Sequence, residues 1–258
     1  MKKICLKISY KGSNYSGWQR QKNVMSIQET IEEGIYKLTN YRTSLYGASR
    51  TDAGVHAKSQ YATFYDNNSS IPADKYLFAL NAILPRDIRI IESFQCNETF
   101  NPRYDAIYKV YSYLIYNKKY SSALWNDLSS QISDKLDLIK MNNSAKTLIG
   151  THDFSAFESS GANVRDKVRT IYESNIMING DFIEYRIKGN GFLYNMVRII
   201  VGSLIDIGRG RLESDCFNSA FSTGQRSCLG FTAEAKGLYL EEITYGDNFR
   251  KENKNETI

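Results

Sequence analysis

The sequence predicts an α+β protein whose sheet is largely antiparallel. Its apolar patterns indicate strands and helices in mixed order, without the strict strand–helix alternation of a parallel sheet. Asn179-Gly180, between two alternating segments, is typical of a tight antiparallel hairpin. The 258 residues, 42% of them hydrophobic and 24% charged, suffice for one large globular domain or two small ones.

The first hundred residues predict the order strand, helix, strand, strand, helix, strand. Residues 3–10 alternate as a half-buried strand does. Ser26 and Glu29 form a capping box, and apolar residues at helical spacing follow, which predicts a helix over 27–39. The other elements are expected as strands over 42–48, 58–66 and 87–95 and as a helix from Pro72 to about residue 83.

A boundary after residue 102 is expected to separate an N-terminal half, 1–102, from a C-terminal half, 103–246. In element order alone, each half matches a ferredoxin-like unit. The charged tail, 247–258, is expected to be disordered. The second half predicts strands over 105–117, 168–178, 181–188 and 236–245, a polar loop over 121–133, and helices over 134–149, 191–207 and 213–221.

Several classes of protein are disfavoured by the composition. The four cysteines are far apart and there are only two histidines, so we expect no metal site and no metal cofactor. Scattered cysteines in a chain of this length are typical of reduced thiols in the cytoplasm. No apolar stretch approaches the roughly 18 residues of a membrane helix, so no membrane partner is expected. A net charge of +5 permits an anionic partner such as nucleic acid but equally fits an ordinary soluble protein.

The segment Gly47–Ala57 is the strongest candidate for chemistry. It is too short and polar for a core element, and it places Arg50 two residues before Asp52 between glycines. A carboxylate held there can serve as a nucleophile or a base, provided that a nearby cation keeps it ionised. Taken alone, Asp52 fits a turn residue better, and Arg50 fits a solvated surface cation.

Three further candidates each have a structural alternative. Tyr111, in a predicted strand, is suited to stacking on a base or to packing in the core. Arg198, in a mostly apolar helix, either reaches solvent or pairs with a carboxylate. Leu238, at the start of the last strand, fits an apolar pocket or ordinary core.

Two other features carry weaker signals. His152-Asp153 is expected at a helix end or in a loop, without a triad partner. The basic cluster formed by Arg165, Lys167 and Arg169 suits phosphate contacts or the solvated side of a strand.

Eight segments in the order found here resemble the TruA family of tRNA pseudouridine synthases. Arg50 through Ala57, which reads RTDAGVHA, is the most specific of them. The others are 10–12 with 15–21, 26–29, 81–85, 109–111, 152–154, 196–198 with 201–202, and 236–239.

The resemblance implies a pseudouridine synthase fold with two ferredoxin-like (RRM-like) halves, one extended antiparallel sheet and a central active-site cleft. It implies isomerisation of uridine to pseudouridine at positions 38, 39 and 40 of the anticodon stem-loop of tRNA, by a homodimer without a cofactor. By matching positions, it assigns Asp52 as nucleophile, Arg198 as its paired cation, Tyr111 as the base-stacking ring, Arg50 as a base-flipping residue and Leu238 as a pocket residue.

Three departures from the family pattern concern the substrate more than the chemistry. Ser49 replaces a usual glycine, Glu234 replaces a usual proline, and 121–133 is poor in family features. The alternatives are therefore the same isomerisation on another RNA, such as ribosomal RNA, or a non-catalytic RNA-binding paralogue. A metal hydrolase built on His56, His152 and Asp52 is the least favoured.

Overall fold

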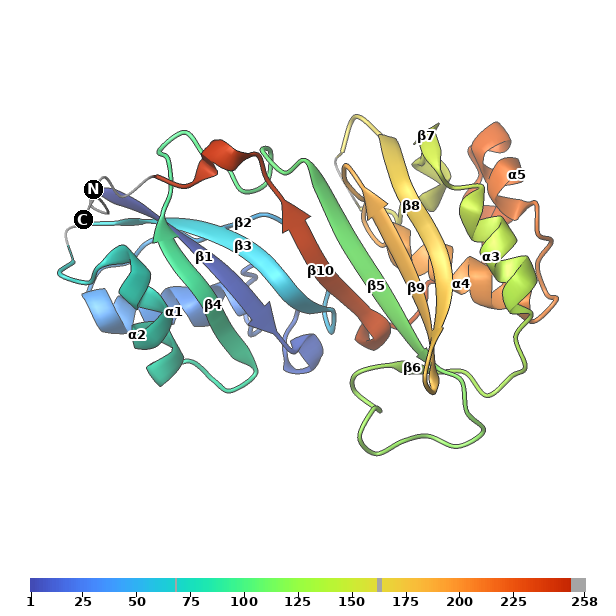
Figure 1. Cartoon of the computed structure of the whole chain (residues 1–258), viewed down its shortest axis with the longest axis horizontal. Helices are drawn as coiled ribbons and strands as arrows, with labels where there is room; N and C mark the ends of the chain where they lie inside the picture. Colours follow the sequence, from blue (N-terminus) through green and yellow to red (C-terminus); the bar gives the residue numbers. More distant parts are fainter. Residues whose placement is uncertain (68, 162–163, 252–258) are drawn as a thin grey trace, which may run out of the picture. The chain divides into compact units, whose positions relative to one another are not determined.

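The computed structural model describes residues 1–67, 69–161 and 164–251 (Figure 1). The chain forms two compact units, one of Met1–Ile107 with the segment from Glu242 and one of Tyr108–Glu241. Both units combine helices with a mainly antiparallel sheet, which confirms the predicted fold class. The first unit extends past the expected boundary at residue 102 because the Ile107 amide donates a hydrogen bond to Thr244 O.

The first unit has a ferredoxin-like strand order. Its sheet runs β4-β1-β3-β2, and each neighbouring pair is antiparallel. The two helices lie on one face of this sheet (Figure 1). The elements are β1 (Lys2–Tyr10), α1 (Ile27–Thr39), β2 (Tyr46–Gly47), β3 (His56–Asp66), α2 (Tyr76–Ile83) and β4 (Ile88–Gln95).

Local signals explain most of these bounds. The Ser26 side chain caps α1 by accepting the Glu29 amide, and Asn40 ends the helix in the left-handed conformation. The predicted helix over 27–39 is therefore confirmed. The expected strand over 42–48 is reduced to the two residues of β2, and a 3-10 turn, Ala73–Lys75, precedes α2.

The second unit repeats this strand order and adds an edge strand, β7, beyond it. The sheet order is β10-β5-β9-β8-β7, with β6 parallel to β5. Asn179 and Gly180 lie at the tight turn of the β8–β9 hairpin, as predicted. The elements are β5 (Tyr108–Tyr116), β6 (Ser130–Gln131), α3 (Leu138–Lys146), β7 (Gly150–Asp153), β8 (Val168–Asn179), β9 (Phe182–Gly189), α4 (Met196–Gly208), α5 (Cys216–Thr223) and β10 (Leu238–Thr244).

Two expectations about this unit were wrong. His152 lies in the edge strand β7, where its ring stacks on Phe221 at 4.4 Å, and not in a loop or at a helix end. Helix α4 begins at Met196 and not at residue 191, because Asn195 has a φ of 60° and cannot continue a right-handed helix.

Ordered chain continues past residue 246, where the disordered tail was expected to start. Asp247–Phe249 form a 3-10 turn, and the Phe249 ring packs on Tyr245 and Phe100. Arg250 pairs with Glu92 at 2.6 Å. Residues 247–251 thus belong to the first unit, while 252–258 lie outside the described residues.

Candidate active site

Asp52 opens a tight turn between β2 and β3. Its carbonyl accepts the Val55 amide at 3.1 Å, and Gly54 has a φ of +80°. A positive φ at the third position of a four-residue turn is the requirement of a type II turn and explains the glycine. Asp52 is half-buried and Arg50 is exposed. The turn alternative for Asp52 is thus correct for its backbone.

The backbone before Asp52 is held by buried polar side chains. Gln60, fully buried in β3, accepts the Ser49 amide at 3.1 Å and donates to Ser49 O at 2.6 Å. The Tyr10 hydroxyl bonds Thr51 Oγ1 at 2.7 Å, and the Trp18 amide donates to Thr51 O at 3.0 Å. These contacts come from β1, β3 and the turn after β1, so the loop is fixed by the sheet itself.

Two glycines let the turn after β1 approach this loop closely. A Cβ on Gly17, whose φ is +90°, would lie 2.7 Å from Thr51 O. A Cβ on Gly12 would lie 2.0 Å from Val55 O. No larger residue fits at either position without moving the Asp52 loop.

His56 has a structural role at the end of the loop. It is 1% exposed, and its Nδ1 accepts the Gly12 amide at 3.0 Å. That nitrogen therefore carries no proton, and its lone pair is taken up by this hydrogen bond. Among the described residues, no group of three or more His, Cys, Asp or Glu side chains is arranged to hold a metal ion.

In the second unit, Tyr111 lies in β5 and packs against the segment before α4. It is 7% exposed, pairs with Ile187 across the sheet, and meets the Phe192 ring edge-on at 5.2 Å. Leu238, the first residue of β10, is also buried. Packed surroundings hold both side chains in place, which suits a core role and a rigid pocket wall equally.

The Arg198 guanidinium is fixed in direction. Its Nε donates to Ala233 O and its Nη1 to Asn195 Oδ1, each at 2.8 Å. The Ala233 amide returns a bond to Arg198 O at 3.0 Å. Arg198 is therefore a positioned cation rather than a freely solvated one.

Asn195 links this arginine to a neighbouring loop. Its side-chain amide donates to Ser159 Oγ at 3.0 Å while its carbonyl oxygen accepts Arg198. Next to Ser159, the buried Glu158 pairs with Lys167 at 2.8 Å. One member of the basic cluster, Lys167, is thus engaged in an ion pair that anchors this loop.

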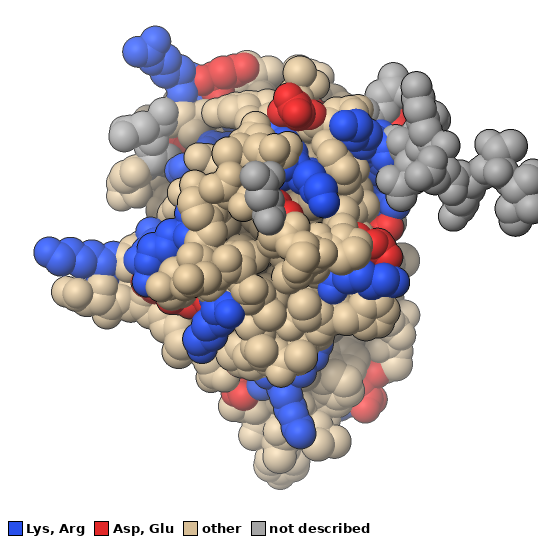
Figure 2. Space-filling model, turned by 90° about the vertical axis from the view of Figure 1, so that its left-hand side faces the viewer, with Lys and Arg blue, Asp and Glu red and all other residues tan. Residues whose placement is uncertain are grey.

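Basic side chains do not form one block on the face drawn in Figure 2. Lys and Arg are dispersed there among uncharged residues and a few Asp and Glu. No helix of the described ranges is long and apolar enough to span a bilayer.

A family model described as tRNA pseudouridine synthase matches residues 7–105 and 144–246. The chain belongs to the tRNA pseudouridine synthase family.

Relatives cover almost the whole chain. A tRNA pseudouridine synthase A of Acetivibrio thermocellus is 46% identical over 95% of this chain and 100% of its own length. A tRNA pseudouridine synthase A 2 of Clostridium tetani is 44% identical over 94% of this chain and 98% of its own length. A match to one chain of a solved Cbf5-Nop10-Gar1 complex covers 79% of this chain and 54% of the solved chain, with 12% sequence identity and a TM-score of 0.33.

In this member of the family, Arg50 and Asp52 belong to the first compact unit, and Tyr111, Arg198 and Leu238 belong to the second. All five were predicted from the sequence. Two residues were not: Gln60, which clamps the Asp52 loop, and Asn195 in its role beside Arg198. A polar residue inside a strand and an asparagine before an apolar helix were the only signals for them.

Proposed function

We propose that this chain isomerises uridine to pseudouridine in the anticodon stem-loop of tRNA, at positions 38, 39 and 40. The reaction breaks the bond between uracil N1 and the ribose, and rejoins the ribose to uracil C5. A proton leaves C5 and a proton is gained at N1, so the product is an isomer of the substrate. The observation that carries the proposal is the rigid, half-buried Asp52 turn in a member of the tRNA pseudouridine synthase family.

Each site residue then has a proposed role. Asp52 is the nucleophile that assists departure of the base. Arg198, whose direction is fixed by Asn195 and Ala233, supplies the cation that favours the ionised carboxylate.

The other three residues handle the target base after it leaves its stack. We propose that Tyr111 stacks on the uracil, that Leu238 excludes water beside it, and that the exposed Arg50 contacts the RNA while the base is extruded. These roles rest on the family resemblance and agree with the buried Tyr111 and Leu238 side chains and the exposed Arg50.

The decisive experiment compares wild-type protein with Asp52→Ala on unmodified tRNA, with pseudouridine mapped by chemical labelling and primer extension. We expect modification in the anticodon stem-loop by the wild type and a loss of at least about 10³-fold in Asp52→Ala, since removal of a nucleophile costs that much or more. Asp247→Asn, which neutralises an exposed carboxylate in the same unit, is the matched control.

Other outcomes separate the alternatives. Modification of ribosomal RNA but not tRNA would favour the same chemistry on another substrate. RNA binding without isomerisation of any RNA would favour a non-catalytic paralogue.

From the same resemblance we infer that the protein is a cytoplasmic homodimer. Light scattering after gel filtration is expected to give about twice the 29.5 kDa of one chain. A mass of one chain at micromolar concentration would contradict the dimer.

A further inference from the structure

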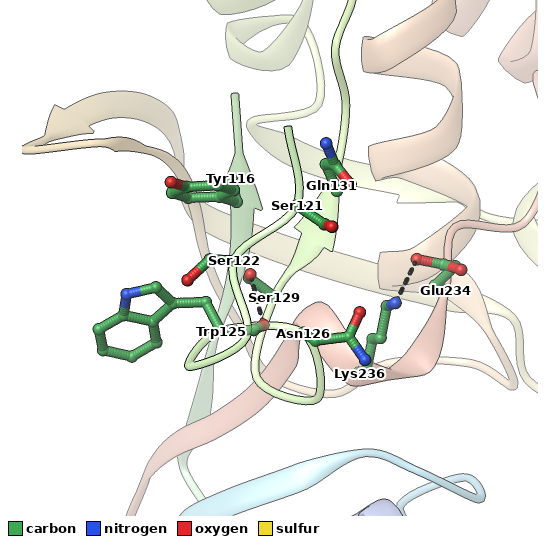
Figure 3. Close-up of a pocket in the computed structure, with 9 residues that line it drawn as sticks. All are labelled: Tyr116, Ser121, Ser122, Trp125, Asn126, Ser129, Gln131, Glu234 and Lys236. Atoms are coloured by element: carbon green, nitrogen blue, oxygen red, sulfur yellow. Dashed lines mark hydrogen bonds and ion pairs between the residues drawn. The ribbon is translucent and has the colours of Figure 1, made fainter. Parts of the chain in front are cut away.

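A polar hollow in the second unit is not used by the proposed chemistry. The connection between β5 and β6 closes over it, and the turn before β10 forms its other side (Figure 3). Its volume is about 190 Å³, and all of its lining residues lie within Tyr108–Glu241. The residues that matter here are Ser121, Ser122, Trp125, Asn126, Glu234 and Lys236.

Two of the three departures from the family pattern meet at this hollow. Glu234 accepts a hydrogen bond from Ser130 Oγ at 3.0 Å, so the residue that replaces a usual proline binds the segment that is poor in family features. That segment also lies between the two stretches matched by the family model, 7–105 and 144–246. The loop side of the hollow therefore lies outside the stretches that the family model matches.

The walls of the hollow are braced against the strand that carries Leu238. The Tyr239 hydroxyl donates to Leu128 O at 2.5 Å, and Tyr113 donates to Glu234 O at 2.8 Å. Burial raises the pKa of Tyr113, so its hydroxyl keeps the proton that it donates. A ligand in the hollow would thus contact residues two to four positions from Leu238 in a braced segment.

The lining chemistry suits a nucleobase. Serine hydroxyls and the Asn126 amide both donate and accept hydrogen bonds. Glu234 and Lys236 pair at 3.4 Å, which leaves no net charge to hold a phosphate. Trp125 is 40% exposed and lies at the opposite end from this ion pair in Figure 3, where a flat ring can stack on its free surface.

We propose that this hollow binds an unpaired base of the RNA substrate other than the target uridine, and that the base carries an exocyclic amino group. The Glu234 carboxylate, 58% exposed on its side chain, is the acceptor for that amino group. The proposal rests on the proposed function, because it requires an RNA substrate, and it adds a specificity-determining contact outside the reacting site.

The test measures the Kd and the single-turnover rate of tRNA transcripts with wild type, Trp125→Ala, Glu234→Gln and Asn126→Ala. We expect Trp125→Ala to raise the Kd by about 10-fold, as loss of one base stack does, while the rate at saturation stays unchanged. Trp125→Phe, which keeps a flat ring, should restore binding. Trp125→Leu keeps apolar bulk against Phe182 but has no ring to stack, so it should not restore binding, which separates stacking from packing. Tyr41→Ala, which removes a similarly exposed ring (43%) in the other unit, is the control.

A second series identifies the base. Transcripts with one unpaired nucleotide made abasic are bound to wild type and to Trp125→Ala. At one position, the abasic change should raise the Kd of the wild type by about the same 10-fold and leave the Kd of Trp125→Ala unchanged. Uridine, which has no exocyclic amino group, should raise the Kd of the wild type when placed at that position but not the Kd of Glu234→Gln.

The outcomes distinguish this proposal from the proposed function. If the wild type is active but the variants of the hollow bind every transcript as well as it does, only the proposal for the hollow would be overturned. A wild type that modifies no RNA would overturn the proposed function. If the binding losses from every abasic position and from Trp125→Ala simply add, no base stacks on Trp125, and the proposal for the hollow would be overturned.

Discussion

Asn195 adopts a backbone conformation that most side chains avoid, and it does so beside Arg198. Its φ of 60° places it in the left-handed region, which costs most residues with a Cβ roughly 1–2 kcal/mol and which asparagine tolerates better than they do. It caps α4 by position, yet its side chain makes no cap hydrogen bond. The side chain instead joins Ser159 to the guanidinium, so a residue in the left-handed region sets the direction of a candidate site residue.

We predict that Asn195→Gly and Asn195→Ala both slow the single-turnover isomerisation by about 10-fold, the equivalent of one hydrogen bond to a charged group. Only Asn195→Ala should also lower the melting temperature markedly, because glycine tolerates the left-handed conformation. Asn195→Asp keeps an acceptor for Arg198 and tolerates this conformation, so it should retain most of the rate. A wild-type rate in Asn195→Gly would show that the amide does not position Arg198.

At the scale of elements, the Asp52 loop depends on a turn that lies far from it in the sequence. The turn after β1 contacts the loop through backbone atoms, and glycine is required where the two meet. The loop conformation is thus determined by a pair of segments and not by its own residues alone.

Gly17→Ala should therefore reduce activity more than its loss of stability explains. Gly210→Ala is the matched control, since Gly210 also has a positive φ, +71°, but a Cβ there meets nothing within 4 Å. Both variants should lose about 1 kcal/mol of unfolding free energy from backbone strain, and Gly17→Ala should lose more because its Cβ also displaces Thr51. Only Gly17→Ala is expected to lose isomerisation as well, which denaturant unfolding and single-turnover assays check in parallel. Equal activity of the two variants would show that the close approach at Gly17 is not needed.

Elements with short-range signals were predicted well from the sequence. Ser26 and Glu29 specified the start of α1, and Asn179-Gly180 specified the β8–β9 turn. The edge strand β7 was missed because four residues carry no clear period and the strand exists only through pairing with β8.

The same contrast holds for the candidate site. Asp52 was predicted as a site residue from a contiguous string of residues. Gln60 and Asn195 were not assigned roles, because each acts on a segment separated from it in the sequence, and a single sequence does not reveal such contacts.

At the scale of the whole molecule, buried thiols and phenols make the fold sensitive to alkali. Burial raises the pKa of Cys96 from 9.0 to about 11 and that of Cys216 from 9.0 to about 12. Burial likewise raises the pKa of Tyr76 from 10.0 to about 12. In the unfolded chain these groups release their protons at lower pH, so ionisation favours unfolding.

We predict that the denaturant midpoint is constant up to about pH 8.5 and falls as the pH rises from 9 toward 11. The contribution of these groups to the free energy of unfolding is fully present below the pKa values they have in the unfolded chain. It is lost as the pH approaches the pKa values they have in the folded protein. Cys96→Ala and Cys216→Ala, each compared with its own midpoint at pH 8, should flatten the decline. A denaturant midpoint that does not change between pH 8 and 10.5 would contradict the raised pKa values of these groups.

The discontinuous first unit has a consequence for synthesis of the protein. Residues 242–251 supply Tyr245 and Phe249 to a unit whose other strands lie before residue 108. A ribosome releases Tyr108–Glu241 before this segment, so the second unit can be complete while the first still lacks its closing aromatic residues. The unit that carries Asp52 is thus begun before the second unit and completed after it, so its closing aromatic residues join a sheet whose other strands have already been synthesised.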